Sequence, residues 1–173
     1  MIINLQSEGS LRVQTGGAVV LTEGSDPNAL GRMKPDIFIR TSINEAKSLP
    51  DAGFTVNGPG EYEVKEIEIR GYHPFTYFIK AEAINLALLP PSGGKPEALD
   101  NLEKIDILFA PNDGQFAKAI RQLNPPIIIC DQASAKNLEK ELGIKAEITD
   151  KLTIKKKDIP EEGHTKVVVL KVS

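Results

Sequence analysis

The chain has 173 residues, of which 40% are hydrophobic and 26% charged, and its 21 Lys and Arg against 24 Asp and Glu give a formal net charge of −3. This length and composition predict one compact domain over residues 1–173. The slight acidic excess disfavours a nucleic-acid surface, which needs clustered basic side chains. No apolar stretch approaches the roughly 20 residues that span a bilayer, and the opening MIINLQSEGS is unlike a secretory signal. We therefore expect a cytoplasmic protein without a membrane segment.

Short apolar runs separated by turn residues fill the first half of the chain and predict strands. Thr15-Gly16-Gly17 predicts a hairpin turn between two of them, because glycine readily adopts the positive φ that tight hairpins require. Polar and apolar residues alternate over residues 66–70, which predicts a strand with one exposed face. The expected strands cover residues 2–5, 11–14, 18–22, 36–40, 53–56, 62–64, 66–70, 75–80 and 84–89.

After residue 90 the pattern changes to alternating helices and strands. We expect helices over residues 96–102, 114–123 and 134–142, and strands over 105–110, 127–130, 152–155 and 166–172. Ser134 is expected to begin the last helix and Gly143 to end it. The basic run Lys155-Lys156-Lys157, followed at once by acidic residues, is expected to be a solvated turn.

A half built of strands followed by a half in which helices and strands alternate predicts two sheets packed face to face with helices outside. This is a four-layer αββα sandwich, of the α/β (α+β) class. The pattern alone leaves open a second architecture, an open doubly wound sheet with extra hairpins.

The segments GPGEYEV (58–64) and KLTIKKKDIPEE (151–162) are the most distinctive in the chain. With the opening LRVQTGGAVVLTEG, the strand DIFIRT, and the runs VKEIEIRGYH and LEKIDILFAPNDG, they make the chain similar to small members of the metallo-β-lactamase superfamily, the zinc-dependent hydrolases. The resemblance extends over nearly the whole chain in the same order. It implies the same αββα fold that the pattern predicts.

In that family the strand matching DIFIRT leads into a loop T-H-x-H-x-D-H, whose histidines and aspartate hold a pair of metal ions. When the loop is aligned on Thr41, the histidine positions carry Ser42, Asn44 and Lys47, and Ala46 stands at the aspartate position. A lysine ammonium would disfavour a dication nearby. The resemblance therefore implies the fold of a metal-dependent hydrolase with neither metal nor other cofactor at this loop.

The other ligand positions of the family are also altered in this chain. His73 matches one family histidine, but Pro90-Pro91-Ser92-Gly93-Gly94 occupies the position of the bridging aspartate, and Cys130-Asp131-Gln132 that of the last histidine. A different metal site rebuilt from Glu45, His73, Asp113, Cys130 and Asp131 remains an alternative, because carboxylates bind harder cations such as magnesium.

Two functions stay open at this point. The first is a catalytically degenerate member of the family that serves as a binding or assembly module, for an unknown protein partner, a second copy of itself through the strand over residues 166–172, or a small polar ligand. The second is a hydrolase with a rebuilt or non-metal active site, using Ser42 with Lys47 or Cys130 with Asp131. The candidate ligand-binding residues are Ser42, Asn44, Lys47, His73, Asp131 and Gln132.

Overall fold

Two β-sheets form the body of the protein in the computed structural model, which describes residues 1–7, 9–24, 30, 32–42, 49–89, 104–110, 117–161 and 163–173. Sheet A has six strands, in the order β13 (Leu152–Thr153), β1 (Ile2–Ser7), β2 (Ser10–Thr15), β3 (Ala18–Thr22), β4 (Ile37–Ile39) and β5 (Phe54–Val56). Sheet B has eight, in the order β12 (Glu147–Thr149), β14 (Lys166–Leu170), β11 (Ile127–Cys130), β10 (Ile107–Phe109), β9 (Ile84–Leu88), β8 (Thr76–Ala81), β7 (Ile67–Tyr72) and β6 (Gly60–Val64).

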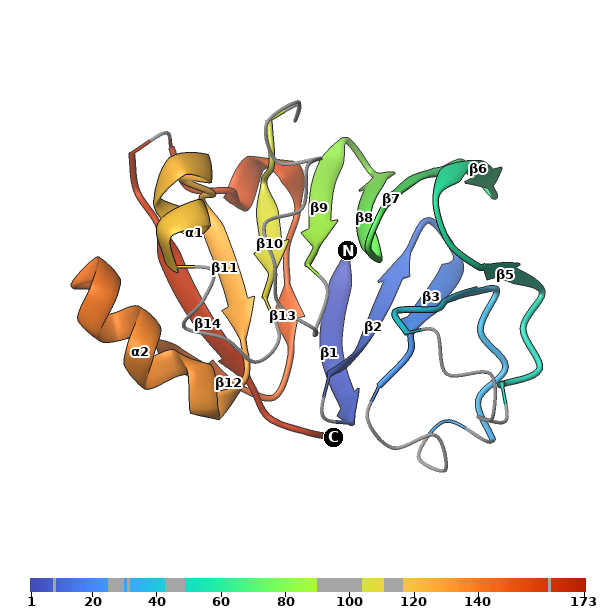
Figure 1. Cartoon of the computed structure of the whole chain (residues 1–173), viewed down its shortest axis with the longest axis horizontal. Coiled ribbons are helices and arrows are strands. Elements are labelled where there is room, and N and C mark those ends of the chain that lie inside the picture. The colour runs from blue at the N-terminus through green and yellow to red at the C-terminus, as the bar shows by residue number, and fades with distance from the viewer. Residues whose placement is uncertain are drawn as a thin grey trace.

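The parallel strands of the two sheets run in the same direction and end at the same side of the molecule. In sheet A, β3, β4 and β5 are parallel neighbours, and in sheet B β9, β10, β11 and β14 are. A parallel bridge between Leu5 and Val172 joins the two sets, and in Figure 1 the arrowheads of β9, β10, β11 and β14 point to the lower side. We call this side the carboxyl edge and the opposite side, where these strands begin, the amino edge.

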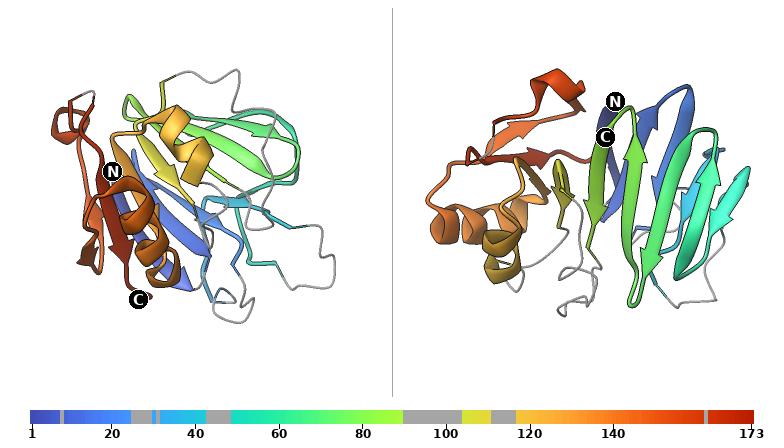
Figure 2. Two further views of the ribbon diagram at one scale, coloured as in Figure 1. Left: turned by 60° about the vertical axis from the view of Figure 1, so that its left-hand side comes forward. Right: turned by 90° about the horizontal axis from the view of Figure 1, so that it is seen from above.

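Aliphatic side chains fill the space between the sheets and the space outside sheet B. The inner core contains, among others, Ile3, Val13 and Ile39 from sheet A and Ile79 and Ile129 from sheet B, all at most 1% exposed. A second core lies on the outer face of sheet B, where it is covered by α1 (Ala117–Leu123) and α2 (Gln132–Leu142). Figure 2 shows both helices on the side of sheet B away from β1 to β3.

The outer face of sheet A has a different cover in the described part of the chain. There Leu21 and Phe38 pack against Leu30, with Met33 and Ala52 beside them, so connecting segments cover this face and the described helices lie against sheet B alone. Two mixed sheets with helices outside confirm the predicted fold class.

The distinctive segment around Pro59 connects the two sheets. It leads from β5, at the end of sheet A, to β6, at the end of sheet B. Phe54 of β5 and Tyr62 of β6 meet edge to face, with ring centroids 6.0 Å apart. The predicted turn between strands is therefore the crossover that closes this side of the sandwich.

Most of the expected strands are present, and the hairpin at Gly16-Gly17 is confirmed by the pairing of Thr15 with Ala18. The predicted start of the last helix was wrong. The last helix begins at Gln132 and not at Ser134, because the Asp131 side chain caps it. The strand β14 does not lie at a sheet edge, because it has β11 on one side and the unpredicted strand β12 on the other. The helix expected over residues 96–102 lies outside the described residues.

The lysine run is also more structured than a solvated turn. It forms a short 3₁₀ helix, η4 (Lys156–Asp158), whose residues are exposed. The ammonium of Lys156 reaches Asp106, a residue only 1% exposed, at 2.7 Å. In the part of the chain that is described, no helix is long and apolar enough to cross a membrane.

Candidate functional site

Polar residues follow each of the parallel strands of sheet A at the carboxyl edge. Glu23 follows β3, Arg40 to Ser42 follow β4, and Asn57 follows β5. The amide of Glu23 donates to the carbonyl of Ile39 at 2.9 Å, which brings Glu23 beside the end of β4. The carboxyl ends of parallel strands are where open α/β sheets usually carry their sites, because the strands fix the loops that leave them.

The Glu23 carboxylate organises the start of the loop after β4. It is only 4% exposed, and its Oε2 atom accepts three hydrogen bonds of 3.0 Å, from the Thr41 amide, the Ser42 amide and the Ser42 hydroxyl. The Thr41 hydroxyl also donates to the Glu23 carbonyl at 3.3 Å. Donors that converge on one oxygen are typical of anion-binding backbone nests. Here the chain's own carboxylate occupies the nest.

Tyr77 connects sheet B to this region. Its hydroxyl donates to the Arg40 carbonyl at 2.7 Å, so the side chain joins the two sheets at the carboxyl edge. The pKa of Tyr77 is raised to about 12, chiefly by burial. The nearby Glu23 carboxylate contributes to this rise, and the Gly58 amide opposes it. The phenol is therefore protonated at neutral pH and acts as a fixed donor.

The structure places four of the predicted site residues on connections at the carboxyl edge. Ser42 binds Glu23, as described above, and the side chain of His73 is exposed in the turn between β7 and β8. Gln132 is exposed at the first position of α2. The site itself stays a prediction, and two of its members, Asn44 and Lys47, lie outside the described residues.

Asp131 has a structural task that accounts for its position. Its Oδ1 atom accepts the Ser134 amide at 2.7 Å, which satisfies one of the open donors at the start of α2. The carboxylate is thereby directed at its own helix. Sequence analysis assigned the cap to Ser134 because both residue types serve well as helix caps.

The described residues do not fit the pair of metal ions that this fold carries in the family it resembles. Among them, no three His, Cys, Asp or Glu side chains come close enough to hold a metal ion. Cys130 is buried, and desolvation raises its pKa to about 12, with Asp131 adding to the shift. A thiol in this state is a poor metal ligand and nucleophile. Of the rebuilt set, Glu45 and Asp113 lie outside the described residues.

Glu23 is not among the residues predicted from the sequence, although its carboxylate accepts three hydrogen bonds from the start of this loop. A glutamate directly after a buried strand resembles an ordinary surface residue, and its hydrogen-bond partners lie 18 and 19 positions further along the chain. A weak signal exists in the sequence. The apolar run Val19-Val20-Leu21 leads straight into Thr22-Glu23-Gly24, a polar turn at the end of a parallel strand.

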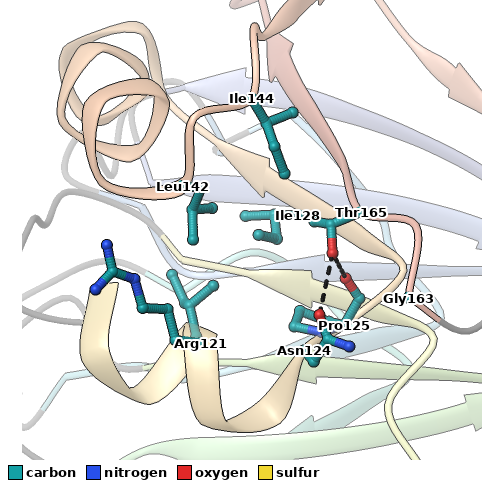
Figure 3. Close-up of a pocket in the computed structure, with 9 residues that line it drawn as sticks. Arg121, Asn124, Pro125, Ile128, Leu142, Ile144, Gly163 and Thr165 are labelled. Carbon is teal, nitrogen blue, oxygen red and sulfur yellow. Dashed lines mark hydrogen bonds between the residues drawn. The ribbon is translucent and has the colours of Figure 1, made fainter.

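A small pocket lies elsewhere, at the amino ends of β11 and β14 (Figure 3). Its volume is about 210 Å³, and its walls combine aliphatic side chains such as Ile128 and Leu142 with polar ones such as Arg121 and Asn124. At one end the Thr165 hydroxyl donates to the Pro125 carbonyl at 3.1 Å. The pocket is smaller than most ligand sites, which measure roughly 300–1,000 Å³, and none of the predicted site residues lines it.

No protein-family model and no curated protein matches the chain. Solved structures do match it, and three of them are described next. A protein from Thermotoga maritima, described as a Zn-dependent hydrolase of the metallo-β-lactamase superfamily, is 19% identical, with 98% of each chain covered and a TM-score of 0.78. Igni18, a metallo hydrolase from Ignicoccus hospitalis, is 12% identical, with 89% of this chain and 99% of that chain covered and a TM-score of 0.64. The metallo-β-lactamase fold protein YhfI from Bacillus subtilis is 9% identical, with 98% and 96% covered and a TM-score of 0.62. These similarities confirm the fold that the sequence resemblance implied.

Proposed function

We propose that this chain, which has the metallo-β-lactamase fold, is a catalytically degenerate member that serves as a binding or assembly module. The observation that carries the proposal is the start of the loop after β4. In the family that the sequence resembles, this loop carries metal ligands, whereas here the Thr41 and Ser42 amides and the Ser42 hydroxyl donate to Glu23. An amide N–H cannot coordinate a cation, and the Ser42 hydroxyl is directed at the carboxylate, so this arrangement does not suit a metal-activated water.

The polar groups described at the same edge are also assigned to other tasks. Asp131 caps α2, and Tyr77 holds the Arg40 carbonyl. A zinc site needs several imidazole, thiolate or carboxylate groups directed at one point. The contacts of these residues support a fold kept for packing and recognition, without the machinery that would generate a hydroxide nucleophile.

A hydrolase that works without metal receives little support from the described residues. Ser42 donates its hydroxyl proton to a carboxylate that is already the acceptor for two amides, so the same carboxylate oxygen is poorly placed to activate it. The Cys130 thiol is buried, with a pKa of about 12, and would need a strong base beside it to react.

Of the two kinds of partner, a small polar ligand suits the molecule better than strand pairing with another chain. The free edge of sheet B at β6 carries Glu61 and Glu63, whose like charges oppose pairing with a second copy. At the opposite end, β12 has only three residues. The carboxyl edge, with its buried polar groups, is the region where we place binding.

Metal analysis of the purified protein tests this proposal. The protein is incubated with an excess of zinc, manganese or iron, desalted and analysed by mass spectrometry for bound metal, beside a metallo-β-lactamase-fold enzyme that carries its ions. We expect below about 0.1 equivalent of metal, since no three His, Cys, Asp or Glu side chains of the described residues converge on one point. Binding near one equivalent, with hydrolysis of a phosphodiester or lactam reporter that stops on addition of EDTA, would contradict it.

A further inference from the structure

Glu23 is a buried carboxylate whose two oxygen atoms have very different surroundings. The Oε2 atom accepts three hydrogen bonds at 3.0 Å from Thr41 and Ser42. Among the described residues, the Oε1 atom has no hydrogen-bond partner, although it is inaccessible to solvent. The whole residue is 4% exposed.

The hydrogen bonds to the loop after β4 account for the burial of Oε2 and leave that of Oε1 unexplained. A buried polar atom without a partner lowers the stability of the folded chain, and it does so more strongly when it belongs to a charged group. Native proteins rarely keep such atoms unless a function or a bound molecule accounts for them. The Oε1 atom therefore needs a partner that does not come from the described chain.

Two further buried polar atoms at the carboxyl edge are in the same condition. The hydroxyl of Ser7, at the end of β1, is 6% exposed at the residue level, and the hydroxyl of Thr76, at the start of β8, belongs to a residue with no exposure. Neither hydroxyl has a partner among the described residues. Tyr77, next to Thr76, pairs with Leu88, which places Thr76 at the end of β9 and thus at this same edge.

The chemistry of these atoms defines what can satisfy them. A carboxylate oxygen only accepts hydrogen bonds, whereas a hydroxyl both donates and accepts. The missing group at Glu23 must therefore carry an N–H or O–H donor. An anion or a pure acceptor such as an ester carbonyl would be repelled by the carboxylate.

We infer that the carboxyl edge holds a small ligand with an amine or hydroxyl group that donates a hydrogen bond to Glu23 Oε1. This inference rests on the proposed function, because it names the ligand class of the binding module. It also assigns Glu23 two tasks, since one oxygen orders the loop and the other contacts the ligand.

Amide chemical shifts of the ¹⁵N-labelled full chain, recorded in EDTA, test the inference with three probes. Ethanolamine offers an ammonium and a hydroxyl, glycerol offers hydroxyls alone, and acetate offers only acceptors. We expect ethanolamine, glycerol or both to shift the Thr41 and Ser42 amides in a saturable manner, because these amides bind the same carboxylate. Acetate should leave both amides unchanged. The responsive donor then tells an amine from a polyol.

Glu23→Gln serves as the variant, and Glu61→Gln on the exposed edge strand β6 as its matched control. Loss of the charged acceptor should weaken the responding probe at least about tenfold, as expected for a charge-assisted hydrogen bond. The control should bind within about twofold of the wild-type chain, because the Glu61 side chain is 85% exposed and belongs to the other sheet.

The inference is overturned if neither donor probe shifts the two amides, if acetate shifts them equally, or if Glu23→Gln responds as the wild type does. The titration of the wild-type chain tests the inference without any variant, so it remains valid even if Glu23→Gln does not fold. Metal content measured on the same purified protein before EDTA is added separates this failure from that of the proposed function. A metal-loaded protein contradicts the latter, whereas metal-free protein without a response contradicts the ligand class alone.

Discussion

Carboxylates at the two edges of the sandwich have contrasting environments. At the amino edge, Glu82 accepts the Met1 amino group on one oxygen and the Thr15 hydroxyl and Gly16 amide on the other, all at 2.8 Å. At the carboxyl edge, Glu23 accepts three donors on one oxygen, and its other oxygen has no partner among the described residues.

Two other carboxylates at the amino edge each accept a backbone amide and a lysine ammonium, on both oxygens in Asp36 and on Oδ2 alone in Asp106. Asp36 accepts the Val19 amide on one oxygen and the Lys65 ammonium on the other, and the Lys65 contact is the main reason that the Asp36 pKa is lowered. Asp106, which is 1% exposed, accepts the Asn85 amide at 2.8 Å and the Lys156 ammonium at 2.7 Å. The contrast indicates that the amino edge stabilises the fold, while the carboxyl edge keeps an incompletely paired group of the kind found at binding sites.

The largest effect is expected at Asp106. Asp106→Ala should lower the free energy of unfolding by about 3 kcal/mol, because it removes a buried carboxylate that pairs with Lys156 and leaves the Asn85 amide without its acceptor. Urea denaturation followed by circular dichroism measures the change. Lys156→Met, the control, keeps the aliphatic stem and the Asn85 contact and should cost about 1 kcal/mol. A loss below about 0.5 kcal/mol for Asp106→Ala would contradict the view that the amino edge stabilises the fold.

A smaller, pH-dependent effect is expected at Glu82. The Met1 amino group, the Thr15 hydroxyl and the Gly16 amide lower its pKa from 4.5 to about 2. A depressed pKa means that the stabilisation is fully present above pH 4.5 and is lost as the pH falls toward 2. Because this side chain is 39% exposed, solvent screens the contact, and Glu82→Gln should cost only about 1 kcal/mol at neutral pH.

Unfolding experiments at a series of pH values check the Glu82 prediction. The difference between the wild type and Glu82→Gln should shrink as the pH falls from 4.5 to 2. Asp51→Asn is the control, because Asp51 and its partner Lys34 are 80% and 79% exposed and their pair should contribute nothing measurable. A difference that is constant with pH would show that Glu82 acts through packing and not through its charge.

The smallest effect is expected at Glu23, despite its deep burial. In Glu23→Gln the carboxamide oxygen still accepts the Thr41 and Ser42 donors, and the unpartnered charged oxygen is removed, so the loss should stay below about 1 kcal/mol. Thermal and urea unfolding measure it beside Asp106→Ala. An equally large loss for both variants would mean that the two edges do not differ in the way we describe.

Local sequence patterns predicted most of the fold. The apolar runs Ile37-Phe38-Ile39 and Ile127-Ile128-Ile129 became buried strands because such residues pack well on both faces of a covered sheet. The strand β12 was missed because it has three residues, with Ile148 of the middle position 56% exposed, so it carries no periodic signal.

The contacts of the candidate site were much less predictable. Glu23 depends on donors from the loop after the next strand, and Lys156 meets Asp106 across 50 positions. Such pairs form only when the sheets have come together, and no local pattern reports them. The altered family loop predicted a site at the edge of the fold where Ser42 lies. The pattern gave no indication that the Ser42 hydroxyl faces an internal carboxylate.

Gly71 of β7 lies against the Tyr77 ring and the crossover at Gly58. A methyl group added there would lie 2.6 Å from the Gly58 carbonyl oxygen and 2.9 Å from a ring carbon of Tyr77. The crossover, the phenol and the Arg40 carbonyl that it binds are thus fixed at one separation. For protein engineers this means that a histidine-rich loop transplanted after β4 would start from a backbone anchor that is already rigid. A dinuclear centre on this scaffold would also require ligands at the other altered positions, such as Cys130-Asp131-Gln132.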